Sequence, residues 1–273
     1  MNPTVKQILS LIDSDIAPWH LAESWDNCGL CAGNPEWPVR RVLVGLDADM
    51  PLLQAARHWQ ADMVLTHHPL FITPVKTIDF SVMPGSAIAL AASEKIAVVC
   101  AHTNLDKAEN GLNDYLAHQL HIQDTRIMEI DTDAAEMTGH LTGLGRVGPV
   151  PAPLSLAQMA DQIKLRLGVH PVRVVGNVKL EICEAAVCSG SGGSLIPAFL
   201  ASGADVFITG DIKYHEARLI ESQGKALIDV GHFASEIIAV DLLTRRLGQA
   251  GSRAGFTLEI QAFTGETDPF VSV

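Results

Sequence analysis

The sequence predicts an α/β fold with a largely parallel sheet, and three observations support this prediction. Short apolar segments without an alternating polar face, such as residues 62–65 and 97–101, are typical of strands buried on both sides. Segments with apolar residues at helical spacing lie between these strands. With 273 residues, of which 48% are hydrophobic, the chain is long enough to bury one large core or two modest ones.

The first half of the chain alternates helices and strands, which favours parallel pairing. Five apolar residues at helical spacing predict an amphipathic helix over residues 4–22: Val5, Ile8, Leu9, Ile12 and Ile16. A turn-rich stretch at 25–30 follows. The later elements of this half are expected as a strand at 41–47, a helix at 52–60, a strand at 62–65, a Pro-punctuated loop at 73–84, a helix at 87–95, a strand at 97–101 and a helix at 110–121.

A shift toward Gly and Pro between residues 124 and 179 indicates a change of domain. We therefore expect a first α/β subdomain at 1–123, containing the His67-His68 pair and Asp106, and a second at 124–273, containing His232 and Glu236. A helix at 155–167 and a strand at 172–175 are expected within the second.

The segment 143–148 reads Gly-Leu-Gly-Arg-Val-Gly and matches the dinucleotide-binding fingerprint by letter. A nucleotide-binding loop leads into a helix, whereas Gly148 is followed by the sequence Pro-Val-Pro-Ala-Pro. We therefore expect no nucleotide cofactor at this segment.

The last third repeats the strand and helix pattern of the first half. Strands are expected at 184–188, 205–209 and 226–230, with helices at 195–202 and 214–222 between them. The segment 203–211 (Gly-Ala-Asp-Val-Phe-Ile-Thr-Gly-Asp) has the same apolar pattern and polar end as the segment 60–68 (Gln-Ala-Asp-Met-Val-Leu-Thr-His-His). This similarity indicates an internal duplication that gives two similar subdomains.

Histidines and carboxylates follow three of the predicted strands. Six such residues are present: His67, His68, His102, Asp106, His232 and Glu236. Ligands bind outside the carboxyl ends of strands in open α/β sheets, and an i, i+4 pair such as His232 and Glu236 shares one helix face. Imidazoles with carboxylates suit divalent zinc, manganese, iron, cobalt or nickel. Because one ion rarely takes more than roughly four protein ligands, we expect two ions with a carboxylate between them.

Each of these residues also has a purely structural interpretation. Two histidines at a strand end can be hydrogen-bonded surface residues, and Asp106 can cap a turn. The pair His232 and Glu236 can stabilise a helix start, where the dipole favours a carboxylate. Their occurrence at three strand ends favours one shared metal site over three independent structural roles.

Two further motifs remain open from the sequence. Residues 189–194 (Ser-Gly-Ser-Gly-Gly-Ser), between a strand and a helix, can hold a phosphate or carboxylate on backbone amides, or form a tight structural turn. Cys28 and Cys31 form a lone C-x-x-C, for which two ordinary thiols are favoured over a zinc or redox role.

Composition excludes several classes of protein. A net charge of −12 argues against a nucleic-acid partner, which needs clustered Lys and Arg. No apolar stretch reaches the roughly 18 residues needed to cross a bilayer, and the first residues do not resemble a signal peptide. The chain has five cysteines, an odd number, and their spacing does not resemble that of a disulfide-rich domain. This argues against a secreted domain stabilised by disulfides. We expect a cytoplasmic protein without membrane association.

Five motifs support a family resemblance, namely residues 26–30 (Asp-Asn-Cys-Gly-Leu), His67-His68, His102-x-x-x-Asp106 with Asn110-Gly111 after it, Thr209-Gly210-Asp211, and Gly231-His232-x-x-x-Glu236. Their order and spacing resemble the Nif-three-like family, whose bacterial members carry the name GTP cyclohydrolase type 2 homologue. The resemblance runs nearly from end to end. It implies a three-layer αβα protein with mixed sheets and two similar subdomains, a dinuclear metal centre, and assembly into a ring-shaped hexamer.

Carried over position by position, the resemblance also implies a ligand set. His67 and Asp106 bind one ion, His68 and His232 bind the other, and Glu236 bridges them. His102 matches a family motif position beside the site. Because many relatives carry a second histidine where this chain has Phe233, we expect no further ligand there.

We therefore predict a metal-dependent hydrolase, similar to GTP cyclohydrolase type 2, in which a water bridging two divalent ions attacks a small-molecule substrate. His102 or His215 is the candidate for moving protons. The alternative is a metal-stabilised scaffold or regulatory binding protein without turnover. Open coordination positions on the ions favour hydrolysis, whereas closed ligand shells favour the structural role.

Overall fold

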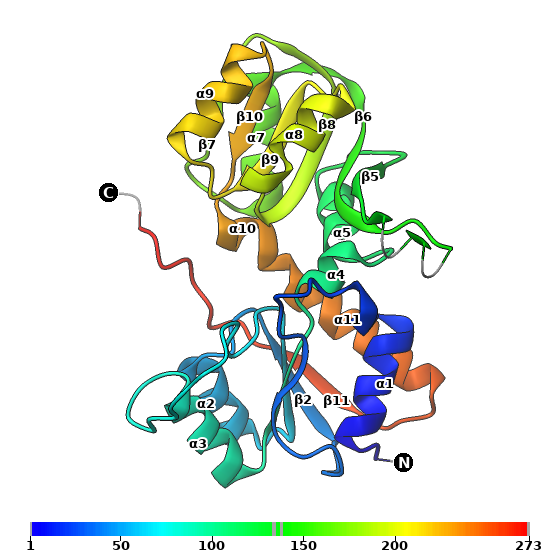
Figure 1. The fold of residues 1–273 in the computed structure, drawn as a ribbon, viewed down its shortest axis with the longest axis vertical. Helices are drawn as coiled ribbons and strands as arrows, with labels where there is room; N and C mark the ends of the chain where they lie inside the picture. Colours follow the sequence, from blue (N-terminus) through cyan, green and yellow to red (C-terminus); the bar gives the residue numbers. More distant parts are fainter. Residues whose placement is uncertain (1, 133–134, 137–138, 272–273) are drawn as a thin grey trace. The chain divides into compact units, whose positions relative to one another are not determined.

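The computed structural model describes residues 2–132, 135–136 and 139–271 (Figure 1). Within these ranges the chain forms two compact units. Unit 1 contains the residues up to Ala108 together with Ala239–Thr267. Unit 2 contains Glu109–Ile238 and the residues from Asp268 onward.

Unit 1 is built on a five-stranded sheet in the order β1-β4-β3-β2-β11. β2, β3, β4 and β11 run parallel, and β1 pairs antiparallel with β4. The strands are β1 Gly29–Ala32, β2 Arg41–Gly45, β3 Met63–Thr66, β4 Ala97–Cys100 and β11 Glu259–Ala262. The helices are α1 Val5–Asp15, α2 Met50–Trp59, α3 Gly85–Glu94, α4 Thr103–Lys107 and α11 Ile238–Arg253, with a 3₁₀ turn η1 at Trp19–Leu21.

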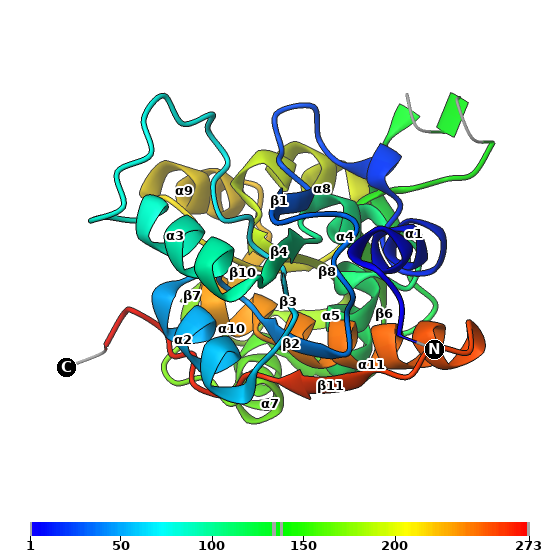
Figure 2. The same cartoon turned by 90° about the horizontal axis from the view of Figure 1, so that it is seen from below.

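Helices cover both faces of the unit 1 sheet. Figures 1 and 2 show α2 and α3 on one face and α1 and α11 on the other. Leu43, Val64 and Val98, one from each central strand, pack with the apolar residues of α2 and α3. The residues next to them in each strand are also buried and point to the opposite face. Burial on both faces explains why these strands carry no polar alternation.

α1 is shorter than the helix expected over residues 4–22. It begins with a capping box, in which Thr4 and Gln7 exchange hydrogen bonds between side chain and backbone. It ends at Asp15 because Pro18 has no N–H and disfavours a helical conformation in the residue before it.

Unit 2 is built on a six-stranded sheet in the order β5-β6-β8-β9-β10-β7. β8, β9 and β10 run parallel, whereas β5, β6 and β7 pair antiparallel. The strands are β5 Arg126–Ile130, β6 Gly143–Ser155, β7 Arg173–Val175, β8 Glu181–Ser191, β9 Val206–Gly210 and β10 Ala226–Asp229. The helices are α5 Leu112–Gln119, α7 Leu156–Leu167, α8 Ile196–Ser202, α9 Tyr214–Ser222 and α10 His232–Glu236, with a 3₁₀ turn η2 at Gly193–Leu195.

Helices cover both faces of the unit 2 sheet, α5 and α7 on one and α8 and α9 on the other (Figure 2), and each face has its own buried cluster. One joins α5 and α7 to the strands through Ile208 and Ile228. The other joins α8 and α9 to the strands through Phe207 and Leu227, and Phe199 of α8 stacks on Phe207 with ring centroids 5.2 Å apart. Adjacent strand residues thus enter opposite clusters, as the pleat requires.

The two units repeat one order of elements. Unit 1 contains α1-β1-β2-α2-β3-α3-β4, and unit 2 contains α7-β7-β8-α8-β9-α9-β10. In both sheets three parallel strands follow one another, and an antiparallel strand, β1 or β7, lies beside the third. The predicted fold class, with three layers, mixed sheets and an internal duplication, is confirmed.

The division of the chain differs from the boundary expected between residues 123 and 124. Unit 2 already begins at Glu109, because Leu116 and Leu120 pack into the core of its sheet. Residues 239–267 return to unit 1, where β11 pairs with β2. The change of composition at 124 therefore marks the β5 and β6 strands and not the start of a folding unit.

The Gly-rich segment 143–148 lies inside β6, where Gly143 pairs with Ile130 of β5. It does not lead into a helix, in agreement with the Pro-rich continuation of the sequence. Among the residues that the structure describes, no helix combines the length and apolar character needed to cross a membrane.

Candidate functional site

His67 lies at the carboxyl end of β3 and is fully buried. Its ring nitrogen Nδ1 lies 2.9 Å from the carbonyl oxygen of Ala101. Because a carbonyl only accepts hydrogen bonds, Nδ1 carries the hydrogen and Nε2 keeps its lone pair. Nε2 lies 3.9 Å from Oδ1 of Asp106. His67 is thus held in a tautomer that can bind a metal ion.

His68 is held from the neighbouring strand β2. Its backbone N–H donates to the carbonyl of Leu46 at 2.9 Å, and its own carbonyl accepts from Oγ1 of Thr66 at 2.7 Å. Nδ1 of His68 lies 2.8 Å from Oδ1 of Asp47, which follows β2. The carboxylate favours the hydrogen on Nδ1, which leaves the lone pair of the ring on Nε2.

Asp47 is itself positioned by Glu266 from the last segment of unit 1. The backbone N–H groups of Leu46 and Asp47 donate to Oε1 of Glu266 at 2.7 and 2.9 Å. Burial raises the pKa of Glu266, and its Oε2 is buried without a hydrogen-bond partner among the described residues. Gly45 leaves space for this carboxylate, since a Cβ there would lie 3.2 Å from Oε1.

His102 follows β4 and is held by Asp26, with 2.9 Å between Nδ1 and Oδ1. The fully buried Asp26 side chain also accepts hydrogen bonds from the backbone N–H and hydroxyl of Thr103 and from the Cys28 thiol. Burial would raise the pKa of Asp26, but these hydrogen bonds outweigh burial and hold its pKa well below the ordinary value. Asp26 is therefore an anion that fixes the His102 ring and the start of α4, which carries Asp106.

The three imidazole rings of unit 1 gather around one point. Ring centroids lie 5.1 Å apart for His67 and His68, 5.2 Å for His67 and His102, and 5.6 Å for His68 and His102. Each ring offers one nitrogen within 4.8 Å of those offered by the other two. Because every Nδ1 already faces an oxygen acceptor, this donor set fits a borderline divalent cation bound through Nε2.

In unit 2, the predicted pair His232 and Glu236 lies on one face of α10. Nε2 of His232 lies 2.8 Å from Oε2 of Glu236, and Nδ1 lies 2.7 Å from Oδ2 of Asp211. The hydrogen bond with Glu236, more than that with Asp211, raises the pKa of His232 to about 9. The nearly buried Glu236 and His232 thus share a proton where a cation could bind instead.

Gly190, at the end of β8, is packed against this pair. A Cβ at Gly190 would lie 2.1 Å from Oε1 of Glu236 and 3.3 Å from Cε1 of His232. The backbone N–H of Gly190 donates to Oγ of Ser235 at 2.9 Å. The Gly-rich segment 189–194 therefore makes room for the Glu236 carboxylate, a role that the sequence did not indicate.

His215 and Phe233 complete the residues singled out from the sequence in unit 2. His215 is exposed on α9, and its ring contacts Tyr214 with centroids 5.3 Å apart. It does not belong to the candidate ligand groups found among the described residues, so its role in moving protons stays a prediction. Phe233 follows His232 in α10 and offers no ligand atom, as expected.

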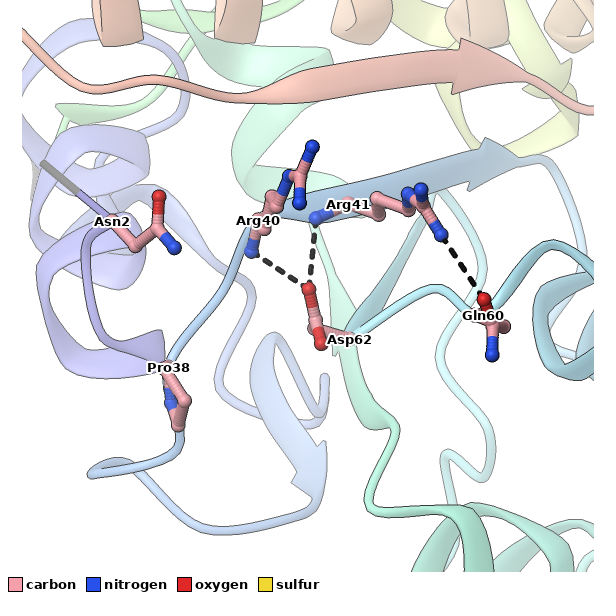
Figure 3. Close-up of a pocket in the computed structure, with 6 residues that line it drawn as sticks. All are labelled: Asn2, Pro38, Arg40, Arg41, Gln60 and Asp62. Atoms are coloured by element: carbon pink, nitrogen blue, oxygen red, sulfur yellow. Dashed lines mark hydrogen bonds between the residues drawn. The ribbon is translucent and has the colours of Figure 1, made fainter.

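A pocket of about 390 Å³ lies elsewhere in unit 1, before the starts of β2 and β3 (Figure 3). Its lining residues are Asn2, Pro38, Arg40, Arg41, Gln60 and Asp62. The backbone N–H groups of Arg40 and Arg41 both donate to Asp62, at 2.7 and 2.9 Å, and both guanidinium groups bond Glu259. Because the histidines follow β3 and β4, this pocket and the imidazole cluster lie at opposite ends of the strands.

Sequence reasoning assigned no positioning role to three carboxylates: Asp26, Asp47 and Asp211. Asp26 and Asp211 were noted only as parts of family motifs. Asp47 lies two residues after β2 and Asp211 directly after β9, so the position that drew attention to the histidines could also have drawn attention to them. Asp26 lies in a turn-rich stretch, and nothing local relates it to His102.

Known proteins are similar to this chain along nearly its whole length. A family model described as Duf34/NIF3 (NGG1p interacting factor 3) matches residues 3–269. A protein of Clostridium acetobutylicum named GTP cyclohydrolase 1 type 2 homolog is 30% identical over 270 residues, which cover 99% of both chains. A protein of Streptomyces coelicolor with the same name is 31% identical over 273 residues, which cover 99% of this chain and 94% of the relative. A crystal structure of a Bacillus cereus protein related to NIF3 has a TM-score of 0.92 at 25% identity, with both chains fully covered. The chain therefore belongs to the Duf34/NIF3 family.

Proposed function

We propose that this protein is a hydrolase that uses two divalent metal ions to act on a small molecule. The observation that carries the proposal is the cluster of His67, His68 and His102. Nδ1 of each proposed ligand, His67 and His68, faces an oxygen acceptor, and His102, held in the same way, lies beside them as the proposed proton carrier. Histidines with separate structural roles need no common orientation. Metal-binding histidines need one, because their lone pairs must meet.

The proposed ligands come from both units. His67 and Asp106 would hold one ion, His68 and His232 would hold the other, and Glu236 would serve both. Five donors are more than one ion with an open position takes, which supports two ions.

The course of the chain supports bringing these ligands together. Asp106 lies just before Ala108, after which the chain leaves unit 1, and Glu236 lies just before Ile238, after which it returns. Both carboxylates are therefore tethered within a few residues of a crossing point between the units.

The surrounding residues supply orientation and proton transfer. Asp47 and Asp211 hold the rings of His68 and His232, and Asp26 holds His102. Two divalent ions that share a carboxylate act as Lewis acids and lower the pKa of a bound water toward neutrality. His102 can accept or donate a proton at Nε2 while Nδ1 stays bonded to Asp26. The names of the relatives support ring hydrolysis similar to that of GTP cyclohydrolase type 2 as the reaction.

A second candidate function is a metal-stabilised scaffold or regulatory binding protein without turnover. It is favoured by the origin of the proposed ligands, since ions bound by residues of both units would tie the units together. We also propose a ring-shaped homohexamer in the cytoplasm on the basis of the family resemblance. Light scattering coupled to size-exclusion chromatography tests the hexamer, and a monomeric mass would contradict it.

The test combines metal analysis with a panel of hydrolase substrates that includes GTP. We expect about two divalent ions per chain in the wild type and loss of about half or more in Glu236→Ala, because a bridging ligand serves both ions. His118→Ala, which removes an exposed histidine of unit 2, should keep its metal and activity. Turnover lost only in Glu236→Ala supports the hydrolase, whereas metal binding without turnover supports the scaffold. Unchanged metal content in Glu236→Ala would contradict the bridging role.

A further inference from the structure

Three cysteine thiols gather where β1 pairs with β4 in unit 1. Cys28 precedes β1, Cys31 lies within it, and Cys100 ends β4. The two strands pair antiparallel with Gly29 opposite Cys100, and the register shifts between residues 30 and 32. Cys31 lies at this irregularity, and its Sγ is 3.7 Å from Sγ of Cys100. Two sulfur atoms distant in sequence are thus almost in van der Waals contact.

The two thiols of the close pair differ in exposure. Cys100 is fully buried, and its thiol donates to the carbonyl of Asn27 at 3.0 Å. Cys31 is only partly buried, so it is the more accessible residue of the pair. Cys28 also contacts the Cys100 thiol. Its own sulfur is bonded to Oδ2 of Asp26 at 3.1 Å and Oδ1 of Asn104 at 3.0 Å, neither of which bonds Cys31.

A hydrogen bond also favours ionisation of one thiol of the close pair. The hydrogen bond between the two thiols lowers the pKa of Cys31. Cys31 therefore ionises more easily than an ordinary thiol, and the thiolate is the reactive form of cysteine.

We propose that Cys31 and Cys100 form an oxidisable dithiol that hydrogen peroxide converts into a disulfide between β1 and β4. The Cys31 thiolate attacks one peroxide oxygen and the O–O bond breaks, which gives a sulfenic acid on Cys31 and a hydroxide that takes up a proton to become water. The Cys100 sulfur then attacks the Cys31 sulfur and the S–O bond breaks. The leaving hydroxide takes the Cys100 proton and becomes a second water. Two thiols lose two electrons in total, and one peroxide is reduced to two waters.

The geometry requires little movement for this reaction. The sulfur atoms must approach from 3.7 Å to about 2.05 Å. Adjacent antiparallel strands already hold the two backbones beside each other, and the irregularity at Cys31 gives local freedom. The reaction uses no metal ion, so it is independent of the proposed hydrolase activity.

The position of the disulfide relates it to the imidazole cluster. β4 leads directly to His102, and the segment before β1 carries Asp26, which holds the His102 ring. A covalent bond between β1 and β4 would therefore join the two segments that position His102.

The test is oxidation of the reduced full-length protein with hydrogen peroxide, followed by alkylation with N-ethylmaleimide and mass spectrometry without reduction. We expect a peptide that joins Cys31 to Cys100, a mass lower by two hydrogen atoms before alkylation, and two fewer alkylated cysteines. Dithiothreitol should reverse all three changes. Cys183→Ser, which changes an exposed thiol of unit 2, should leave the cross-link intact.

Cys31→Ser should abolish the cross-link. Because Cys31 is only partly buried, this variant is a safer choice than a change at the buried Cys100, and its circular dichroism and thermal melting should match the wild type. A disulfide between Cys28 and Cys31, or stable sulfinic acid on Cys31 without a link to Cys100, would overturn the proposal. Persistence of the same cross-linked mass in Cys31→Ser would overturn it as well.

Discussion

Nε2 of His232 lies 2.8 Å from the nearly buried Oε2 of Glu236, and the two side chains share a proton. This hydrogen bond is the main reason that the pKa of His232 rises from 6.5 to about 9. Because the pKa is raised in the folded state, the stabilisation by protonated His232 is fully present below about pH 6.5 and is lost as the pH rises through about 9. A metal ion must displace this proton, so we expect metal affinity to increase with pH over the same range.

Glu236→Gln should lower the pKa of His232 toward 6.5, because an amide does not stabilise the imidazolium as a carboxylate does. NMR titration of the His232 ring in chelator-treated protein measures this pKa. Glu221→Gln, at an exposed ion pair with Arg218 in the same unit, is the matched control and should leave it unchanged. An equally high pKa in Glu236→Gln would show that Glu236 is not its cause.

Gly190→Ala should displace Glu236 and reduce the metal bound per chain. The new Cβ would lie 2.1 Å from Oε1 of Glu236, and Gly190 has a φ of +62° that disfavours alanine. Gly168→Ala is a close control, since Gly168 has a φ of +65° but a Cβ there would meet no atom of the described residues within 4 Å. Both variants should lose about 1 kcal/mol of stability from the backbone, and Gly190→Ala should lose more because its Cβ displaces Glu236. Only Gly190→Ala should lose metal. Elemental analysis and urea unfolding measure the two effects, and equal metal loss in both would contradict the steric argument.

Asp26→Asn should lower the free energy of unfolding by about 1–3 kcal/mol, because the amide NH₂ must face a donor from His102 or Thr103 inside a buried site. The pKa of Asp26 is depressed in the folded state, so its stabilisation is present above the ordinary value of 3.8 and is lost as the pH falls toward the folded value. The variant should therefore be less sensitive to acid than the wild type.

Urea unfolding at neutral and at acidic pH measures both effects. Asp161→Asn, at an exposed pair with Lys164, should change stability by less than about 0.5 kcal/mol. If Asp26→Asn were as stable as the wild type, this would argue against a positioning role for Asp26.

Glu266→Gln and Glu266→Ala should behave differently. The glutamine oxygen can still accept the N–H groups of Leu46 and Asp47, while its NH₂ takes the place of Oε2, which is buried without a hydrogen-bond partner among the described residues. The loss of stability in Glu266→Gln should therefore be smaller than in Glu266→Ala, because both N–H groups keep their acceptor. Glu266→Ala leaves both N–H groups unsatisfied and should cost about 1–3 kcal/mol while weakening metal binding through His68. Thermal melting and metal titration of both variants test this prediction. An equal loss of stability and metal affinity in the two variants would mean that the negative charge of Glu266 matters more than its oxygen acceptor.

The central strands and helices could be predicted because the order of apolar and polar residues within each segment indicates which side chains are buried. β3 and β4 are buried along their whole length, and α7 has one apolar face and a capping box at Ser155. β5 and β6 were missed because their exposure is irregular and glycines and prolines interrupt them. β1 was missed because it is a four-residue strand with a register shift inside a turn-rich stretch.

The candidate histidines could be singled out from the sequence because each lies within three residues of the end of an apolar strand. Their supporting groups depend on contacts between distant segments. Asp26 is 76 positions away from His102, and Cys31 is 69 positions away from Cys100. A single sequence gives no local signal for such pairs, which is why the C-x-x-C motif looked like two ordinary thiols.

The pairing of β11 with β2 has a consequence for synthesis of the chain. β2 is complete by Gly45, yet the strand that covers its outer side begins at Glu259, after all of Glu109–Ile238 has been made. While the ribosome translates that intervening stretch, β2 presents an open edge of backbone N–H and C=O groups, which is a template for pairing with another nascent chain. The emerging polypeptide is thus exposed to aggregation at this edge until its final segment leaves the exit tunnel.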